Sequence, residues 1–263
     1  MKNKEVSKIN KVSWEKTADL HRKLKMDGLL EKFKEPGYSL LDTYETSFLT
    51  DKINVSGKDV IQLCCNNARE LLSIKNLGAN RCVGVDITEG FIQQGRELAQ
   101  VAKQRMDLFS MDVYDIPDSW NNSFDVVYIT VGAICWLQDL NKFITLISRL
   151  LRRNGFLLMY EMHPILEMFE PSSDQPIVPQ YSYFRTDPII EEEGYDYYDN
   201  TQKIESTSIN FQHTLEEIMM DCITNGLNIR EFREYPHDIS NVFKQYESHG
   251  FPMSYILLAQ KSG

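Results

Sequence analysis

Short apolar runs alternate with amphipathic segments between residues 59 and 160 of the chain. The apolar runs have the length of buried strands, and the segments between them carry apolar residues at helical spacing. Strands that alternate with helices of this length form a parallel sheet with right-handed crossovers and helices on both faces. We therefore predict a doubly wound α/β fold. The predicted strands are 59–64, 81–85, 106–110, 124–130 and 156–160, and the helices between them are 68–77, 88–103 and a third that begins after Asp139 and ends at Asn154-Gly155.

The chain on either side of this region follows other patterns. Residues 1–12 are polar and rich in lysine, which predicts a loose arm. Leu20 and Leu24 lie at helical spacing and predict a helix from Trp14 to Phe33. Residues 162–210 are rich in Pro, Tyr, Asp and Glu without a long helical pattern, so we expect a small β-rich cap insertion there.

The C-terminal part predicts one helix and two more strands. Thr214 and Glu217 form a capping box, which opens a helix that Gly226 closes. Residues 228–235 and 254–261 have strand character, and no strong helix separates them. We expect these two strands to pair antiparallel at the edge of the sheet.

Charge and composition exclude several classes of protein. The chain has 28 Lys and Arg against 38 Asp and Glu, a net charge of −10, which argues against binding nucleic acid or anionic lipid. No apolar run approaches the roughly 20 residues of a membrane helix, and the first residues lack the apolar segment of a signal peptide. The five cysteines include no CxxC pair, and the five histidines show no metal-ligand spacing. We expect a soluble cytoplasmic protein with reduced thiols, no metal site, and no nucleic-acid or membrane partner.

Three polar features follow the first three predicted strands. They are the turn from Cys64 to Ala68, the acid Asp86 about 20 residues further on, and Asp112 after the third strand. The carboxyl ends of parallel strands meet at one edge of a sheet, where ligands bind in folds of this kind. We therefore expect all three features to line one crevice.

These side chains suit a ligand that contains adenosine. Asp86 can accept hydrogen bonds from both ribose hydroxyls, and Asp112 can accept one from the adenine amine, with Ile87 and Val113 against the ring. A dinucleotide needs a glycine-rich turn for its pyrophosphate, and this turn has no glycine. Asn66 and its neighbour Asn67 tolerate left-handed backbone, so a ligand with an amino-acid moiety fits such a turn better.

In these residues and in the segments around them, the chain resembles the class I S-adenosylmethionine-dependent methyltransferases. The resemblance rests on VIQLCCNNARELLSIKNLGANRCVGVDIT, MDVYDIP, FDVVYITVGAICWL and RLLRRNGFLLMYEMHP, and on the terminal YILLAQK, which is similar to that family's last, antiparallel strand. It is closest to a small-molecule subgroup with a degenerate, Cys-Asn-x-Gly-like first motif. Gln62 stands where that motif usually has an acid, and Cys64, Asn66 and Ala68 stand at its three glycine positions.

The resemblance implies a Rossmann-like sheet, S-adenosylmethionine as cofactor, and in-line methyl transfer to a small molecule. It divides the chain into an N-terminal helical segment (1–50), a cofactor-binding core (51–161), the cap insertion (162–210) and a C-terminal helix with edge strands (211–263). The cofactor-binding residues that it implies are Cys64, Asn66, Asp86, Ile87, Asp112, Val113, Thr130 and Val131.

Candidates for catalysis and substrate binding lie outside the first motif. His163, with Glu161 as second choice, is the candidate general base, because a histidine can be poised near neutral pH. The alternative is that His163 has a structural role and forms hydrogen bonds within the protein. The candidate substrate residues are Trp14, Trp136, Tyr183 and His213, each of which can equally be a structural residue.

Two other functions stay open at this point. One is a protein of methyltransferase-like fold that binds the cofactor, or nothing, without catalysis, since the glycines of the first motif are missing. The other is an NAD-dependent oxidoreductase, against which the glycine-free turn and the antiparallel C-terminal edge both argue. The sequence identifies neither the methyl acceptor nor the oligomeric state.

Overall fold

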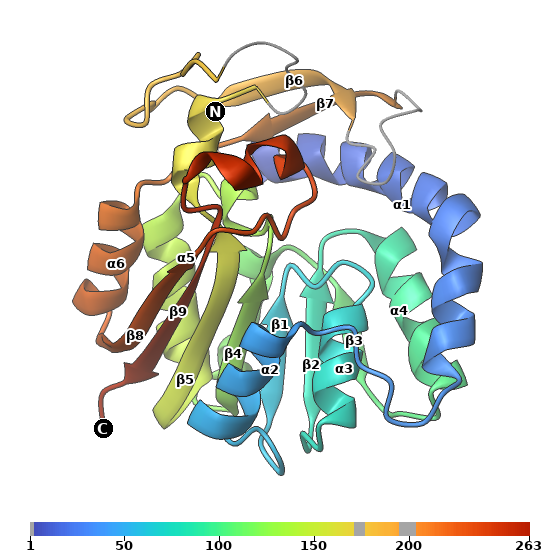
Figure 1. Cartoon of the computed structure of the whole chain (residues 1–263). Helices are drawn as coiled ribbons and strands as arrows, with labels where there is room; N and C mark the ends of the chain where they lie inside the picture. Colours follow the sequence, from blue (N-terminus) through green and yellow to red (C-terminus); the bar gives the residue numbers. More distant parts are fainter. Residues whose placement is uncertain (1–2, 171–176, 195–203) are drawn as a thin grey trace.

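The computed structural model describes residues 3–170, 177–194 and 204–263. A seven-stranded sheet runs through the molecule in the order β3-β2-β1-β4-β5-β9-β8 (Figure 1). Its strands are β1 Val60–Leu63, β2 Cys82–Asp86, β3 Asp107–Ser110, β4 Phe124–Thr130, β5 Leu151–Met162, β8 Leu227–Tyr235 and β9 Ser254–Lys261.

The strand directions confirm the predicted fold class. Strands β3, β2, β1, β4 and β5 pair parallel to one another, and β9 pairs antiparallel to both β5 and β8. This is a mostly parallel, doubly wound sheet with one antiparallel C-terminal strand. All four residues of β1 are buried, as expected of a central strand that is covered on both faces.

Helices cover both faces of the sheet and create two apolar layers. Residues of α5 (Leu140–Leu150) and α6 (Leu215–Thr224) pack on one face, and residues of α3 (Arg69–Asn76) and α4 (Glu89–Val101) pack on the other. The short helix α2 (Thr43–Ser47) and the π-helical turn after it lie on the α3 side.

Two of the helix boundaries predicted from local sequence agree with the structure, and one does not. Asp139 accepts a hydrogen bond from the backbone N–H of Lys142 and so caps α5 as expected, and Gly78 follows α3 with a positive φ of 99°. Asn154-Gly155 does not end α5, because that helix stops at Leu150. The pair lies inside β5 instead, where Asn154 has a φ of 62°.

The first helix, α1 (Asn3–Phe33), corrects the prediction of a loose arm for residues 3–12, and residues 1–2 lie outside the described residues. In the first two-thirds of α1, the buried face consists mainly of small or polar side chains. The sequence there therefore lacks the apolar pattern that usually predicts a helix. Leu24, which suggested the helix, is 41% exposed. The buried residues of the first two-thirds of α1 are Val6, Asn10, Ser13, Thr17, Ala18 and His21.

Hydrogen bonds attach the beginning of α1 to the cap. The cap contains an antiparallel pair of strands, β6 (Ile189–Gly194) and β7 (Ile204–Asn210), which confirms the expected β-rich insertion. The amide of Asn10 bonds to both the N–H and the carbonyl of Ile209, each at 2.8 Å. Residues 171–176 and 195–203 of the predicted cap lie outside the described residues, and the division into four segments stays a prediction.

The middle of α1 is attached to the start of α4. The Glu15 carboxylate accepts hydrogen bonds from the backbone N–H groups of Glu89 (2.9 Å) and Gly90 (3.0 Å). A side chain at position 90 would begin 2.9 Å from the Ala18 methyl carbon, so glycine allows this close approach. In Figure 1, α1 therefore spans from α4 to the cap above the carboxyl ends of the strands.

No helix in the described ranges combines the length and apolar character that crossing a membrane would require.

Replacing Glu15 with Gln tests the attachment of α1 to α4. The amide can accept one of the two N–H bonds but turns a donor toward the other, so we expect a loss of about 1 kcal/mol in the free energy of unfolding. Urea unfolding measures it, with Asp19→Asn, an exposed change on the same helix, as control. Equal stability of the two variants would contradict this role of Glu15.

Candidate functional site

The turn after β1 adopts left-handed backbone without any glycine. Cys64, Asn66 and Ala68 have φ values of 54°, 51° and 54°. These are the three positions at which the resembling family has glycine, whereas Asn67, which we also expected to help, is not left-handed. Left-handed backbone costs an L-residue roughly 1–2 kcal/mol. The backbone shape of a glycine-rich turn is therefore present here despite its side chains.

Asp86 holds this turn in place from the end of β2. One carboxylate oxygen accepts a hydrogen bond from the backbone N–H of Asn66 (2.8 Å), and the other accepts one from the N–H of Thr88 (2.9 Å). Burial raises the pKa of Asp86, while these hydrogen bonds lower it. A carboxylate has about four acceptor positions, so the two backbone N–H bonds do not use up the hydrogen-bonding capacity of Asp86.

Three other predicted cofactor residues lie at or just after the carboxyl ends of β2 and β3. Asp112 caps a short 3-10 turn by accepting a hydrogen bond from the N–H of Tyr114 (3.0 Å). Val113 is only 6% exposed and packs in the core on the α5 side, whereas Ile87 is half-buried. Burial raises the pKa of the half-buried Cys64 thiol, and three nearby carboxylates raise it further. Those carboxylates belong to Asp86, Asp112 and Glu161.

Strands β1, β2 and β3 are parallel neighbours, so their carboxyl ends lie at the same edge of the sheet. Acids from the ends of β2, β3 and β5 all act on one thiol in the turn after β1. A thiol in this environment stays protonated, so Cys64 packs as a small side chain and is not a nucleophile.

Glu161 fixes the loop after β4, which begins at Val131, directly after Thr130 at the end of the strand. Its carboxylate accepts hydrogen bonds from the backbone N–H groups of Gly132 (2.7 Å), Ala133 (2.8 Å) and Ile134 (3.2 Å). The side chain is buried, and burial raises its pKa to about 7 against the opposing effect of these bonds. Glu161 thereby gives the loop a defined shape next to Thr130 and Val131.

His163 is held by two groups of the protein. Its Nδ1 accepts a hydrogen bond from the backbone N–H of Ile165 (3.2 Å), and its Nε2 lies 3.1 Å from the Glu234 carboxylate. Burial lowers the pKa of His163. Because Nδ1 accepts, the proton of the neutral ring is on Nε2 and faces Glu234, so this geometry favours a structural role. A catalytic role for His163 stays a prediction.

Trp14 and Trp136 meet where α1 passes the loop after β4. Their rings pack edge to face with centroids 5.2 Å apart, and Trp14 also contacts Phe91 at the start of α4, with centroids 6.1 Å apart. The sequence predicted both tryptophans as substrate residues without a reason to join them. The structure brings them together between α1, the start of α4 and the loop after β4.

Tyr183 and His213 connect the cap to the main sheet. The Tyr183 hydroxyl accepts a hydrogen bond from the N–H of Leu215 at the start of α6 (2.9 Å). His213 Nε2 bonds to the carbonyl oxygen of Leu137 (2.8 Å), and Nδ1 lies 3.1 Å from the Glu217 carboxylate. These contacts favour a structural role for both residues.

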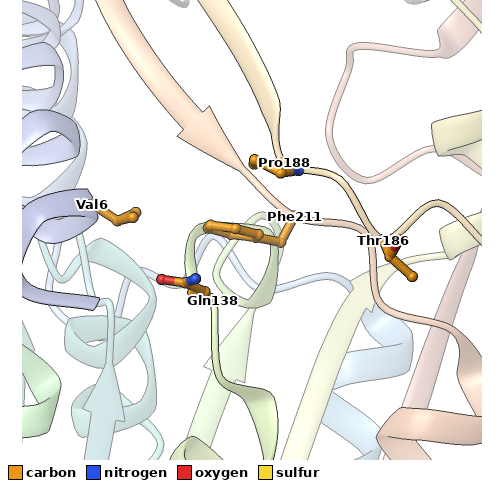
Figure 2. Close-up of a pocket in the computed structure, with 5 residues that line it drawn as sticks. All are labelled: Val6, Gln138, Thr186, Pro188 and Phe211. Carbon is orange, nitrogen blue, oxygen red and sulfur yellow. The ribbon is translucent and has the colours of Figure 1, made fainter. Parts of the chain in front are cut away.

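A pocket of about 240 Å³ lies beside these contacts, between the cap and the beginning of α1 (Figure 2). No charged side chain lines it, and Phe211 and Gln138 lie close together across it (Figure 2). The N–H of Phe211 donates to the carbonyl of Cys135, which joins this pocket to the loop after β4. The lining residues are Val6, Gln138, Thr186, Pro188 and Phe211.

Two buried polar residues on the α2 side of the sheet were not among the sequence candidates for binding. Glu45 on α2 is 5% exposed, and burial together with the nearby acids Glu70 and Asp42 raises its pKa well above the usual range. Gln62 in β1 is fully buried. A five-residue helix is too short to show a hydrophobic period, so no sequence pattern indicates that Glu45 faces inward. Among the described residues, no cluster of His, Cys, Asp and Glu is suited to a metal ion.

Comparison with known proteins gives a domain match and a fold match. Residues 61–159 match a family model described as a methyltransferase domain. An S-adenosylmethionine-dependent methyltransferase from Mesorhizobium loti superimposes with a TM-score of 0.57 at 16% identity, over 79% of this chain and 92% of that chain. At this identity the likeness establishes the fold.

Two curated relatives, both named as uncharacterized, match parts of the chain. A protein of Methanocaldococcus jannaschii is 34% identical over 64 residues, which are 24% of this chain and 29% of that protein. A protein of Haemophilus influenzae is 23% identical over 141 residues, 52% of this chain and 55% of that protein. The chain therefore spans about half or less of the length of the curated relatives that it matches.

Replacing Glu161 with Gln tests its protonation as well as its hydrogen bonds. A folded-state pKa near 7, above the ordinary value of 4.5, means that the folded protein holds a proton that the unfolded chain releases. The contribution of Glu161 to stability is therefore complete below about pH 4.5 and is lost as the pH rises through 7. We expect the free energy of unfolding to fall less between pH 4.5 and 7.5 in Glu161→Gln than in the unmodified protein.

Urea unfolding at several pH values measures this difference. Glu216→Gln, an exposed change in α6, serves as the control and is expected to follow the unmodified protein. Parallel pH profiles for Glu161→Gln and the unmodified protein would show that Glu161 does not titrate as described.

Proposed function

We propose that this chain, whose residues 61–159 form a methyltransferase domain of the class I fold, transfers a methyl group from S-adenosylmethionine to a small molecule. The recognition of that family from the sequence is confirmed by the domain match and by the fold. S-adenosylmethionine is the cofactor that this family implies.

The observation that carries the proposal is the arrangement of Asp86 against the turn after β1. Cys64, Asn66 and Ala68 reproduce a glycine-type backbone, and the Asp86 carboxylate, anchored by Asn66 and Thr88, retains acceptor positions for two ribose hydroxyls. Asp112 stands at the end of the neighbouring strand, which suits an adenine amine. The residues present therefore fit an adenosine, and the side chains in the turn disfavour a pyrophosphate.

The bound cofactor supplies an electrophilic methyl group whose thioether leaving group needs no proton. The protein's part is then mainly to position the acceptor in line and to exclude water. In our proposal Thr130 and Val131 line the reacting end of the crevice, and Glu161 is the positioning residue that holds their loop. Trp14 and Trp136 cover the crevice from the side of α1.

The pocket under the cap is the proposed site for the remainder of the acceptor. Its lining has no charged side chain and includes two polar ones, those of Gln138 and Thr186. Such a lining favours an uncharged, largely apolar group with one or two hydrogen-bonding atoms. His163 is the proposed base only for an acceptor that takes the place of Glu234 beside the imidazole ring of His163.

Replacing Asp86 with Ala tests cofactor binding. We expect the dissociation constant for S-adenosylhomocysteine to rise at least tenfold, because the ribose hydroxyls lose their carboxylate acceptor. Isothermal titration calorimetry measures it, with Asp115→Ala, an exposed acid in the neighbouring 3-10 turn, as the control. Circular dichroism of Asp86→Ala checks that the variant is folded.

Unchanged affinity in Asp86→Ala would contradict the assignment of the ribose site. Binding of NAD without binding of S-adenosylhomocysteine would instead support an oxidoreductase. Binding of S-adenosylmethionine with no S-adenosylhomocysteine released on any acceptor of a broad panel would support the catalytically silent alternative.

Replacing Phe211 with Asp tests the acceptor pocket. A carboxylate in this uncharged lining should abolish S-adenosylhomocysteine release with uncharged acceptors, while the affinity for S-adenosylhomocysteine itself stays within about twofold. The panel is assayed with both proteins by product detection. Productive acceptors that are all charged, or full activity in Phe211→Asp, would place the acceptor elsewhere.

A further inference from the structure

A carboxyl group without a partner lies just beyond the end of β5. Glu167 belongs to the 3-10 turn Pro164–Met168, which follows that strand. Within the described residues, its carboxylate takes part in no hydrogen bond and no ion pair. The side chain is half-buried, so it is partly shielded from water but still within reach of solvent.

The two candidate bases predicted from the sequence are already occupied. Glu161 accepts hydrogen bonds from three backbone N–H groups of the loop after β4. His163 is held between the N–H of Ile165 and the carboxylate of Glu234. Either group has to give up a contact before it can take a proton, whereas Glu167 has no such contact to lose.

Cys135 shows where Glu167 lies relative to the loop after β4. The Cys135 thiol donates a hydrogen bond to the carbonyl oxygen of Gly132 in that loop (3.6 Å). Burial raises the pKa of this thiol, and the carboxylates of Glu167 and Glu161 raise it further. Because charges act over short distances, Glu167 lies near this loop, which carries the proposed reacting end of the site.

The cap covers the same loop. The N–H of Phe211, directly after β7, donates to the carbonyl oxygen of Cys135 (2.7 Å). Glu191 in β6 and Ser208 in β7 are directly opposite each other, so their side chains lie on one face of the hairpin. That face is turned toward the loop, because the charge of Glu191 acts on both Cys135 and Glu167.

Ser208 offers a free hydroxyl on this face. Its side chain is buried, with 1% exposed, and its oxygen has no hydrogen-bond partner in the described part of the chain. A buried hydroxyl without a partner is unfavourable, so it calls for a hydrogen-bonding ligand. The partnerless carboxylate of Glu167 and this hydroxyl are therefore two independent signs of a ligand between the cap and the loop after β4.

Two contacts connect this place to the acceptor pocket. Phe211 lines the pocket and is bonded to Cys135, as described above. Arg185 donates a hydrogen bond to the carbonyl oxygen of Pro188, another lining residue (3.5 Å), and its charge lowers the pKa of Glu167. In Figure 2, Thr186, which follows Arg185, lies on the side of the pocket opposite the beginning of α1.

We propose that Glu167 is the base that takes the proton of the acceptor, and that the acceptor is a neutral compound with an O–H group, hydrogen-bonded by Ser208. This inference rests on the proposed function. An alcohol or phenol is a weak nucleophile until it loses its proton, so such an acceptor needs a base. The neutral lining of the pocket suits the same class of compound.

The proposed step balances without a further reactant. The acceptor oxygen forms a bond to the methyl carbon, and the bond from that carbon to sulfur breaks with its electron pair on sulfur. The O–H proton moves to a carboxylate oxygen of Glu167, which releases it to solvent. The products are the methyl ether and S-adenosylhomocysteine.

The charged groups around Glu167 suit it to this role. Burial and the charge of Glu191 raise its pKa to about 7, and Arg185 opposes them. Near neutral pH the Cys135 thiol stays protonated, because burial and the nearby acids, Glu161 included, raise its pKa well above the usual range. A base works best when its pKa lies near the working pH. We therefore expect kcat/KM to rise as the pH passes through 7 and Glu167 loses its proton.

Replacing Glu167 with Gln tests the base. A panel of neutral alcohols and phenols, assayed by release of S-adenosylhomocysteine, supplies the acceptor. We expect Glu167→Gln to lower kcat at least a hundredfold and to abolish the rise near pH 7, with KM and the affinity for S-adenosylhomocysteine within threefold. Glu167→Asp keeps a carboxylate and should retain at least ten times the activity of Glu167→Gln. Glu192→Gln, an exposed change in β6, is the control.

Replacing Ser208 with Ala separates binding from proton transfer. The hydroxyl holds the acceptor but takes no proton, so KM should rise at least fivefold while kcat stays within twofold. Thr207→Ala, an exposed change at the neighbouring position of β7, should leave both unaltered. An unchanged KM in Ser208→Ala would contradict the assigned contact.

Several results would overturn the inference and leave the proposed function standing. They are a pH profile of the unmodified protein without a rise between pH 6 and 8, a Glu167→Gln protein that keeps more than a third of kcat, an equal loss of kcat and of S-adenosylhomocysteine affinity in that variant, and methylation of amines alone. The pH profile needs no variant to fold. If no acceptor of any class is methylated, the proposed function and this inference fail together.

Discussion

The carboxylate of Asp86 joins three parts of the chain that would otherwise be independent. It ends β2, it fixes the turn after β1 through the N–H of Asn66, and it fixes the start of α4 through the N–H of Thr88. The left-handed residues in the turn are unfavourable by themselves, and two charge-assisted hydrogen bonds offset part of that cost. The turn after β1 and the start of α4 therefore depend on this one side chain for their relative position.

Sequence alone predicted the sheet because each central strand is a short apolar run bounded by turn or capping residues. Asp139 and Thr214 show why helix starts were also accessible, since each accepts a hydrogen bond from the backbone three residues on. The first turns of α1 were missed for the opposite reason. Asn10 and Ser13 are buried through hydrogen bonds to the cap, and such contacts leave no apolar period in the sequence.

Part of the candidate site was likewise predictable from the sequence, and part of it was not. The convergence of Asp86 and Asp112 was predictable, because topology alone brings the ends of parallel strands together. The surroundings of Glu161 were not, since its three N–H partners come from a loop almost thirty residues earlier in the chain. Nor did the sequence indicate that Glu45 would be buried against Tyr128, 83 residues away. Contacts of this kind depend on side-chain packing between elements that are remote in sequence.

The two ends of α1 are secured by different forces. The beginning is bound to the cap through amide and hydroxyl contacts of Asn10 and Ser13, whereas Met26 and Phe33 near its end pack with Leu72 and Leu98 in an apolar cluster. Water can replace the first kind of contact at little cost, but it cannot replace the second. The amino-terminal half of α1 is therefore held by polar contacts for which water competes, whereas the other end is held by burial of apolar side chains.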